Sequence, residues 1–314
     1  MEHIFEKLKL TWRKSNARRK GPEFGIRISA HGDTLTHLRF ADDCMFFAQS
    51  RLDAEKMLRA FIAVSKEYGL KVHAGKTRVM TWNHLSRERR TLNLDQAVFT
   101  ILEETDSERY LGRKLSFYNC HSTELHHRLA AGWSKFHSFR SELTSASYSL
   151  RSRLRLFETI VSTTVLFGCS TWALTRSLLH SLDIVRRKML RYVLRIYPQC
   201  LADQGHNQAR ESWSDYMQRS ARIIERNDEK YKLVSWSSTF KARKWSFAGA
   251  IVRATDERWS RAILDWVPDG YRCIGRPVVR WCDDIVTYAG EHWIDLAKNA
   301  AAWEAHCCGS LMNE

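Results

Sequence analysis

Residues 38–47 read Leu38-Arg39-Phe40-Ala41-Asp42-Asp43-Cys44-Met45-Phe46-Phe47, so two adjacent aspartates interrupt an otherwise apolar segment. We interpret this segment as a β-hairpin with Asp42 and Asp43 at its tip. Neighbouring carboxylates resist joint ionisation, and a hard divalent cation with oxygen ligands relieves that cost. The chemistry that most often needs such a pair is two-metal phosphoryl transfer, as in polymerases and nucleases. The alternative is a solvated Asp-Asp turn, which the apolar flanks disfavour.

The charge of the chain indicates a polyanionic partner. Its 314 residues include 50 Lys and Arg against 35 Asp and Glu, which gives a net charge of +15. That length suits about two domains at ~100–200 residues each. A nucleic acid is a better match to this charge than an acidic membrane surface, and a basic protein without such a partner is the alternative.

Cysteine usage and hydropathy point to a protein inside the cell. The chain has eight cysteines but no CxxC pair, so the spacing of zinc fingers is absent and a reducing compartment is expected. The first residues lack the apolar core of a signal peptide. The longest uncharged run, residues 159–175, is too short and polar for a membrane span and is interpreted as a buried helix.

Hydrophobic spacing predicts an α+β fold in which a mixed region precedes a helical one. In the mixed region we expect helices over 2–10 and 52–68, a basic break over 13–21, and strands over 24–28, 34–40, 44–48, 70–73, 78–82 and 98–102. Gly69 is placed at the C-terminal cap of the second helix. From His121 onward we expect helices over 124–141, 150–172, 178–196 and 214–227. The predicted parts are residues 1–119, 120–198, a linker with a short helix at 199–239, and a Trp-rich basic unit at 240–314.

Two further motifs have competing interpretations. Lys76 lies in a predicted turn, where a lysine can act as a general acid toward a departing pyrophosphate. Without more context a solvent-facing lysine is favoured, because the upstream glycine of a Walker A loop is missing. A second aspartate pair, Asp283-Asp284, precedes a predicted helix. We assign it to capping that helix, since acidic residues complement a helix N-terminus.

Basic and aromatic residues of the second half suggest contacts with nucleic acid. The helix at 178–196 has few compensating acids, which favours contact with a phosphate backbone over a merely solvated face. Its candidate residues are Arg186, Arg187, Lys188, Arg191 and Arg195. The tryptophans of the tail could stack on bases, but a core role is favoured. These are Trp245, Trp259, Trp266, Trp281, Trp293 and Trp303.

Several motifs together resemble the reverse transcriptases of non-LTR, LINE-like retrotransposons. The segment His37-Leu38-Arg39-Phe40-Ala41-Asp42-Asp43 is similar to that family's F/Y-A-D-D hairpin. The segments Tyr68-Gly69-Leu70-Lys71-Val72 and Lys76-Thr77-Arg78-Val79-Met80 are similar to its next palm motif, and Tyr110-Leu111-Gly112 to its primer grip. Residues 150–196, with Phe167-Gly168-Cys169-Ser170-Thr171-Trp172, resemble the thumb. The tail resembles the C-terminal extension through Lys244-Trp245, Gly249, Gly275-Arg276-Pro277 and Arg280-Trp281.

This resemblance implies a fold, a reaction and a set of partners. The fold is a truncated palm of an antiparallel hairpin sheet plus helix, followed by a mostly α-helical thumb and a Trp-rich helical tail. The reaction is RNA-directed DNA synthesis, with Asp42 and Asp43 binding Mg²⁺ or Mn²⁺ and Lys76 assisting pyrophosphate departure. Tyr110, Leu111 and Gly112 would support the primer terminus. The implied partners are an RNA template, a DNA primer and, in the intact parent, deoxynucleoside triphosphates, with no membrane. Nuclear residence follows from where such elements integrate.

The chain also departs from the family's pattern. The family has a further catalytic aspartate on an earlier palm strand, and no matching position is found among Glu2, Glu6, Glu23 and Asp33. His73 stands where the family usually has Asn. Because two-metal catalysis needs carboxylates from two places, we expect the chain alone to be inactive as a polymerase. The alternatives are a non-catalytic nucleic-acid-binding remnant and a genomic remnant with no function.

Overall fold

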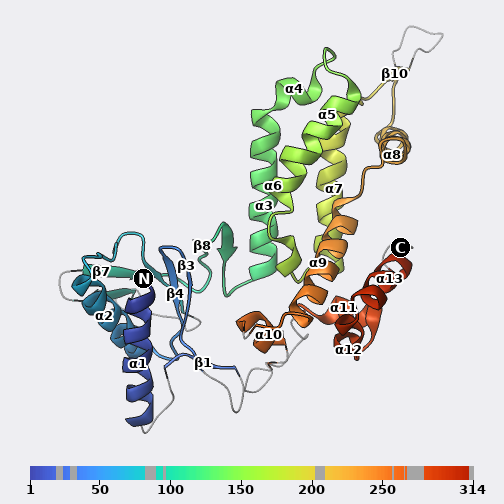
Figure 1. Ribbon diagram of the computed structural model, residues 1–314. Coiled ribbons are helices and arrows are strands. Elements are labelled where there is room, and N and C mark those ends of the chain that lie inside the picture. Colours follow the sequence, from blue (N-terminus) through green and yellow to red (C-terminus); the bar gives the residue numbers. More distant parts are fainter. Residues whose placement is uncertain are drawn as a thin grey trace. The chain divides into compact units, whose positions relative to one another are not determined.

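The computed structural model describes residues 1–18, 24–28, 34–81, 90–94, 97–201, 209–256, 258–264, 266 and 279–310. The chain divides into two units (Figure 1). Unit 1 comprises Met1–Cys120 with Thr255–Gly275, and unit 2 comprises His121–Ala254 with Arg276–Glu314. Trp82, Glu23, Asp33 and Gly275-Arg276-Pro277, which the sequence singled out, lie outside the described residues.

Unit 1 has its core between two helices and a small sheet. Helices α1 (Glu2–Arg18) and α2 (Arg51–Glu67) lie side by side (Figure 1). Apolar side chains at helical spacing on both helices pack with strand residues to form the core. Its members are Ile4, Phe5, Leu8 and Trp12 of α1, Met57, Leu58, Phe61 and Val64 of α2, and Leu92, Leu94, Phe99 and Ile101 of the strands.

The strands of unit 1 pair locally. Antiparallel pairs form between β1 (Ile26–Arg27) and β2 (Thr34–Leu35), β3 (His37–Phe40) and β4 (Asp43–Phe46), and β8 (Glu108–Tyr110) and β9 (Arg113–Leu115). The largest sheet has the order β5-β7-β6. In it β7 (Ala97–Ile101) pairs parallel with β5 (Arg78–Val79) and antiparallel with β6 (Thr91–Leu94). Unit 1 also includes α10 (Trp259–Leu264).

Two local expectations for unit 1 were wrong. Helix α1 continues to Arg18, into the expected basic break, because buried Trp12 extends the apolar stripe of Ile4, Phe5 and Leu8 by another turn. Strands β6, β8 and β9 were not predicted. Residues 70–73 form no strand, because Gly69 (φ 72°) ends α2 in a Schellman motif. There the amide of Leu70 donates to the carbonyl of Ser65 (2.9 Å), and the chain turns away from any neighbouring strand.

Unit 2 is built from helices around a second core. Helices α3 (Cys120–Ser138), α5 (Leu150–Leu156) and α7 (Arg176–Val193) run alongside one another, with α4 (Arg140–Thr144) at one end (Figure 1). A glycine allows two of these elements to approach closely: a Cβ added at Gly132 of α3 would lie 2.3 Å from Cγ2 of Val165. Val165 belongs to the short helix α6 (Thr163–Val165).

The expected continuous helix over 150–172 is interrupted. A π-helical turn spans Phe157–Ser162 between α5 and α6, and a 3₁₀ turn at Cys169–Thr171 follows Gly168, whose φ is 66°. The hydroxyl of Thr159 donates to the carbonyl of Arg155 (2.9 Å), and that of Thr163 donates to the carbonyl of Thr159 (2.6 Å). Such threonine back-bonding bends helices, which gives a physical reason for the interruption.

The rest of unit 2 is also mainly helical. After the short pair β10 (Cys200–Leu201) and β11 (Ala209–Arg210) come α8 (Trp213–Tyr231), α9 (Trp236–Val252), α11 (Asp283–Ala289), α12 (Trp293–Lys298) and α13 (Ala300–Ser310). Helix α8 is longer than the short helix expected there. Trp245, Trp293 and Trp303 are buried, so the predicted core role is confirmed for these three.

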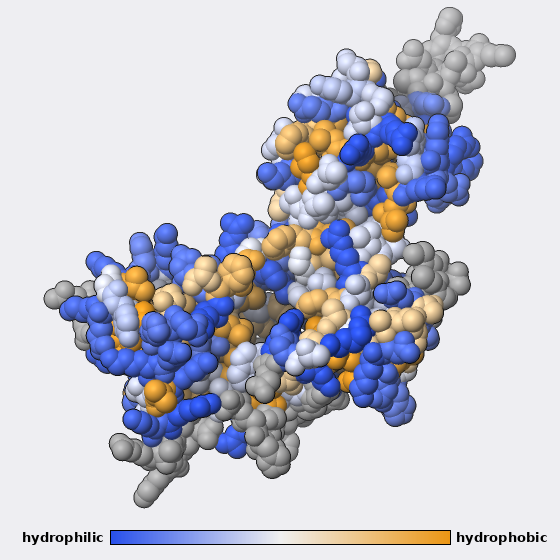
Figure 2. Space-filling view, viewed as in Figure 1, coloured by the Kyte–Doolittle hydropathy of each residue, from blue (hydrophilic) through white to orange (hydrophobic). Residues whose placement is uncertain are grey.

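The two units together give a mixture of helices and small sheets that is compatible with the predicted α+β class. Apolar residues reach the surface in places on both units, among mostly hydrophilic ones (Figure 2). Within the part of the chain that is described, no helix combines the length and the apolar character needed to cross a bilayer.

Candidate active site and nucleic-acid interface

The aspartate hairpin forms as the sequence predicts. Its register pairs Phe40 with Asp43 and Arg39 with Cys44, which leaves Ala41 and Asp42 as a two-residue turn. Ala41 has a φ of 52°, a left-handed conformation that costs an L-residue about 1–2 kcal/mol. Asp42 and Asp43 are both exposed at this tip.

Aromatic packing anchors the arms of the hairpin to the helices of unit 1. The ring of His37 on β3 stacks on Phe5 of α1 with centroids 4.4 Å apart, and Phe46 on β4 lies 5.0 Å from Phe61 of α2. Arg39 forms an ion pair with Glu2 at 2.5 Å. Burial among these groups lowers the pKa of His37 to about 4, so the ring is neutral at pH 7. The arms are thus fixed while the carboxylates project into solvent.

The predicted primer-grip residue Tyr110 lies near the hairpin. Burial raises the pKa of Tyr110, and the negative charges of the Cys44 thiolate and the Asp43 carboxylate raise it further. Burial also raises the pKa of the Cys44 thiol, with Asp43 and Asp42 adding to the effect against Arg39. One predicted primer-binding residue is therefore within electrostatic reach of Asp43.

The other two primer-grip residues form the turn between β8 and β9. Leu111 and Gly112 have φ values of 48° and 78°, which is the pattern of a type I′ hairpin turn. Glycine adopts this geometry freely, whereas leucine is strained in it. The Leu111 side chain is 41% exposed, so the turn presents an apolar group to solvent.

Lys76 is exposed in the turn that follows α2. Its backbone amide donates to the carbonyl of His73 (3.0 Å) and is also 3.2 Å from Nδ1 of that residue. His73 thus shapes the turn that presents the lysine. Among the described residues, no hydrogen bond or ion pair joins the Lys76 ammonium to Asp42 or Asp43, so its predicted catalytic role stays a prediction.

The donor set of the hairpin suits a divalent cation only in part. Asp42 and Asp43 offer two carboxylates, and Mg²⁺ is commonly held by one or two carboxylates with water and phosphate oxygens completing the shell. In the described ranges, no group of three or more His, Cys, Asp and Glu side chains is arranged to hold a metal ion. The hairpin therefore offers two neighbouring carboxylates, and no third His, Cys, Asp or Glu ligand joins them among the described residues.

Arg186 was wrongly assigned to nucleic-acid contact. Its side chain is 2% exposed and binds Asp228 of α8 through two hydrogen bonds of 2.9 Å each. This bidentate pair joins α7 to α8, and the guanidinium is not available to a phosphate. Lys188 and Arg195 are exposed, and Arg187 and Arg191 are half-buried.

The second aspartate pair has a structural role that the sequence revealed only in part. Asp283 is the first residue of α11, and its carboxylate accepts a hydrogen bond from the backbone amide of Arg280 (2.7 Å), which precedes the helix; the N-cap residue, Cys282, makes no side-chain capping hydrogen bond. Asp284 binds the buried Lys244 ammonium of α9 at 2.8 Å. Lys244 also lies over the ring of Trp281 at 5.3 Å. Burial lowers the pKa of Lys244, which opposes the effect of its carboxylate partner.

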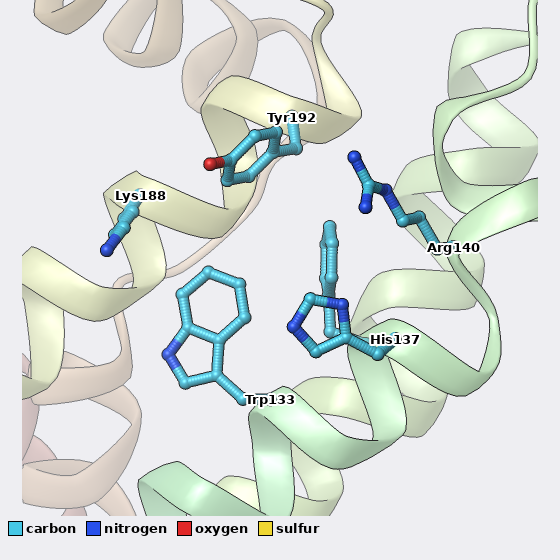
Figure 3. A pocket seen from close by; sticks show the side chains of 6 residues that line it. Trp133, His137, Arg140, Lys188 and Tyr192 are labelled. Carbon is cyan, nitrogen blue, oxygen red and sulfur yellow. The ribbon is translucent and has the colours of Figure 1, made fainter.

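Sequence patterns did not predict a cleft of about 240 Å³ in unit 2 (Figure 3). Residues of α3, α4 and α7 line it: Trp133, Phe136, His137, Arg140, Lys188 and Tyr192. The available signal was helical spacing, because Trp133, His137 and Arg140 are four and three residues apart while Lys188 and Tyr192 are four apart. Only the fold shows that the two groups face each other.

Comparison with known proteins supports the interpretation of unit 1. Residues 1–115 match the family described as reverse transcriptase (RNA-dependent DNA polymerase), a range that includes α1, the aspartate hairpin, α2 and the β8–β9 hairpin. An uncharacterized transposon-derived protein of Caenorhabditis elegans is 28% identical over 288 residues, which cover 88% of this chain and 97% of that protein. No solved structure matches the chain. The first match supports a reverse-transcriptase-like function for this part of the chain, and the second protein is described as transposon-derived.

Proposed function

We propose that this chain is the late palm, the thumb and the C-terminal extension of a reverse transcriptase from a non-LTR retrotransposon. In this assignment residues 1–119 are the partial palm, 120–198 the thumb, 199–239 a linker with a helix, and 240–314 the extension. The observation that carries the proposal is the pair Asp42 and Asp43 at the tip of an anchored hairpin, inside the region that matches reverse transcriptases. The family also implies an RNA template and a DNA primer as partners.

In the proposed reaction the hairpin contributes carboxylates and the neighbouring turn positions the primer. Asp42 and Asp43 would hold Mg²⁺ or Mn²⁺, which activates the attacking hydroxyl and stabilises the leaving pyrophosphate in two-metal transfer. Tyr110, whose hydroxyl titration is sensitive to Asp43, would keep the primer terminus near those carboxylates together with Leu111 and Gly112. Lys76 would approach the triphosphate from the exposed turn that follows α2.

We expect this chain on its own to bind nucleic acid without extending a primer. Two-metal transfer needs carboxylates from more than one place to hold both ions at about 3.5–4 Å spacing. The described part of the chain adds no third ligand to the hairpin pair. A single weakly held ion leaves the attacking hydroxyl or the leaving group without its counter-charge, so deoxynucleoside triphosphates would not be consumed.

Primer extension on an RNA template tests the catalytic part of the proposal. The purified chain and the double variant Asp42→Ala/Asp43→Ala are compared with Mg²⁺ and with Mn²⁺, and neither is expected to incorporate nucleotides. Incorporation by the chain that disappears in the double variant would overturn the expected inactivity, because a complete site would then have formed.

Lanthanide luminescence tests the metal-binding part separately. Tb³⁺ replaces hard divalent cations at oxygen sites, and its emission should rise with the unaltered chain and be lost in Asp42→Asn/Asp43→Asn. The matched control is Glu103→Gln/Glu104→Gln, which removes an adjacent acidic pair from another exposed turn of unit 1. Equal emission from all three proteins would contradict a metal role for the hairpin.

A non-catalytic nucleic-acid-binding protein is the second candidate. The net charge of +15 and the aromatic cleft with basic residues in unit 2 favour it. This candidate is favoured if Asp42→Ala/Asp43→Ala leaves the affinity for RNA and DNA unchanged and if the hairpin binds no metal ion. Under both candidate functions we propose that the protein resides in the nucleus. Imaging of the tagged chain in cells tests this location.

A further inference from the structure

We propose that the cleft between α3 and α7 takes one unpaired nucleobase of a single-stranded RNA or DNA. This inference rests on the proposed function in one respect, namely that nucleic acid is the partner. It adds a specific contact in unit 2 that is distinct from the hairpin, and it assigns that contact to a base rather than to a phosphate.

Aromatic rings supply the floor and walls of the cleft (Figure 3). Phe136 lines the cleft and is buried at 1% exposure. Trp133 stacks on His137 with centroids 5.6 Å apart and an interplanar angle of 25°, while Tyr192 stands edge-on to Trp133 at 6.4 Å and 78°. Rings set at these angles form a corner that accepts a flat heterocycle against one face and one edge. Base stacking on aromatic side chains is tolerant of sequence, because every base has a π-face.

Positive charge surrounds the rings. Lys188 lies over Trp133 with its ammonium 5.6 Å from the ring centroid, and both Lys188 and Arg140 are exposed at the rim. Figure 3 shows the side chains of Lys188 and Arg140 on either side of the aromatic group. Cations on two sides of an aromatic group would leave the centre to a base and bind the flanking phosphates, which is how single-stranded nucleic acid is commonly held.

The acidic groups of α3, α4 and α7 do not line the cleft, and Glu142 of α4 accepts a hydrogen bond from the hydroxyl of Ser141 (2.8 Å). The carboxylate of Glu124 on α3 is buried and paired with Arg128 at 2.9 Å. Asp183 on α7 accepts a hydrogen bond from the backbone amide of Ser237 (3.1 Å). The residues that line the cleft include the cations Arg140 and Lys188 and no carboxylate. An anionic ligand is therefore favoured at the rim.

The cleft lies at the edge of the unit 2 core. Phe136 belongs to that core, and Trp133 packs against it near the buried Leu129 and Met189. Tyr192, in contrast, is 38% exposed, and His137 is exposed beside it. An acidic peptide would satisfy the cations but would leave the exposed ring faces without a flat partner. A nucleotide satisfies both.

The test compares a strand that has bases with a strand that has only the backbone. Fluorescence anisotropy at one salt concentration measures binding of the full chain to oligothymidylate, to oligouridylate and to an abasic strand, each about eight nucleotides long. The unaltered chain should bind both base-containing strands about tenfold more tightly than the abasic strand, which is the effect of one stacked base. Trp133→Ala should abolish this preference and leave the affinity for the abasic strand unchanged.

Matched variants separate stacking from a folding defect. Trp213→Ala removes a tryptophan of α8 that is 69% exposed outside the cleft, and it should keep the tenfold preference. Trp133→Phe, which retains a ring, should keep part of it. Should Trp133→Ala fail to fold, as judged by circular dichroism, Tyr192→Leu takes its place with the same expectation, since Tyr192 is partly exposed.

Each outcome separates this inference from the proposed function. Equal binding of the base-containing and abasic strands by the unaltered chain would overturn the base site while leaving nucleic acid as the partner. Loss of affinity for all strands in Trp133→Ala would also overturn it, because the residue would then act through the fold. Tighter binding of a polyglutamate peptide than of either oligonucleotide would assign the cleft to an acidic protein. No binding of any strand would remove both proposals.

Discussion

Two reciprocal hydrogen bonds join Trp245 of α9 to Trp303 of α13. The indole N–H of Trp245 donates to the backbone carbonyl of Trp303 (2.9 Å), and that of Trp303 donates to the carbonyl of Trp245 (3.0 Å). The rings stack between these bonds with centroids 3.8 Å apart and an interplanar angle of 8°. Both donors are thereby satisfied in a buried place, where an unpaired N–H would be costly. This pair joins the last helix of the chain to α9.

Enlarging Gly249 should loosen that junction. A Cβ at Gly249 would lie 2.7 Å from Cδ1 and Nε1 of Trp303, so Gly249→Ala forces the indole away from its stacked position. We expect a loss of about 1–3 kcal/mol in the free energy of unfolding, as in other overpacked cores. Urea unfolding followed by tryptophan fluorescence measures it. Ser246→Ala, on an exposed position of the same helix, is the control and should change little. A Gly249→Ala chain as stable as the parent would show that the close approach is not required.

Removing Arg186 should destabilise the chain without directly weakening nucleic-acid binding. Its bidentate pair with Asp228 is buried on the arginine side, and breaking such a pair costs about 3–5 kcal/mol. The comparison is Arg195→Asn, because asparagine tolerates the left-handed backbone at this exposed position (φ 57°). Arg195→Asn should preserve stability and lower the salt dependence of nucleic-acid binding by about one phosphate contact. Thermal unfolding and binding titrations over a series of salt concentrations measure the two effects. If removal of Arg186 instead lowered the salt dependence of binding without loss of stability, Arg186 would be assigned to the nucleic-acid interface.

The sequence predicted those features that depend on nearby residues. The two hairpin arms follow from apolar runs on either side of Asp42-Asp43, and both are confirmed by the β3–β4 register. Helix α2 was confirmed within one residue at each end, because its apolar stripe is regular and Gly69 marks its end. Local spacing and turn chemistry are sufficient for such elements.

The remaining features depend on partners far apart in the chain. Arg186 and Asp228 are separated by 42 residues, and Lys244 and Asp284 by 40, so no periodicity links them. A basic residue on a helix therefore has the same sequence signature whether it is exposed or paired in the interior. The cleft lined by Trp133 and Tyr192 could not be predicted from the sequence for the same reason, because it forms only where two helices meet.

Acid should weaken unit 1 through His37. The pKa of this ring is lowered to about 4 from the ordinary value of 6.5, chiefly by burial and then by Lys9 and Arg39. Between these values the unfolded chain binds a proton that the folded chain does not, so stability rises with pH. The contribution of His37 is complete above pH 6.5 and is lost as the pH falls from 6.5 toward 4. Urea unfolding at pH 7.5, 5.5 and 4.5 measures this slope, and His37→Phe should reduce it. An unchanged slope in His37→Phe would assign the acid sensitivity to other groups.

Relieving backbone strain at Ala41 should stabilise the aspartate hairpin. The φ of 52° at Ala41 is left-handed, and glycine adopts it without the clash between Cβ and the backbone. Ala41→Gly should therefore raise the free energy of unfolding by up to about 1 kcal/mol, although glycine also adds freedom to the unfolded chain. Ala63→Gly, at an exposed position inside α2, is the matched control and should lower it by about 1 kcal/mol. Urea unfolding of the unaltered chain and the two variants measures whether each substitution raises or lowers the free energy of unfolding. If both variants lose stability equally, the backbone at Ala41 is not strained. No functional reason would then be needed for an alanine beside the aspartates.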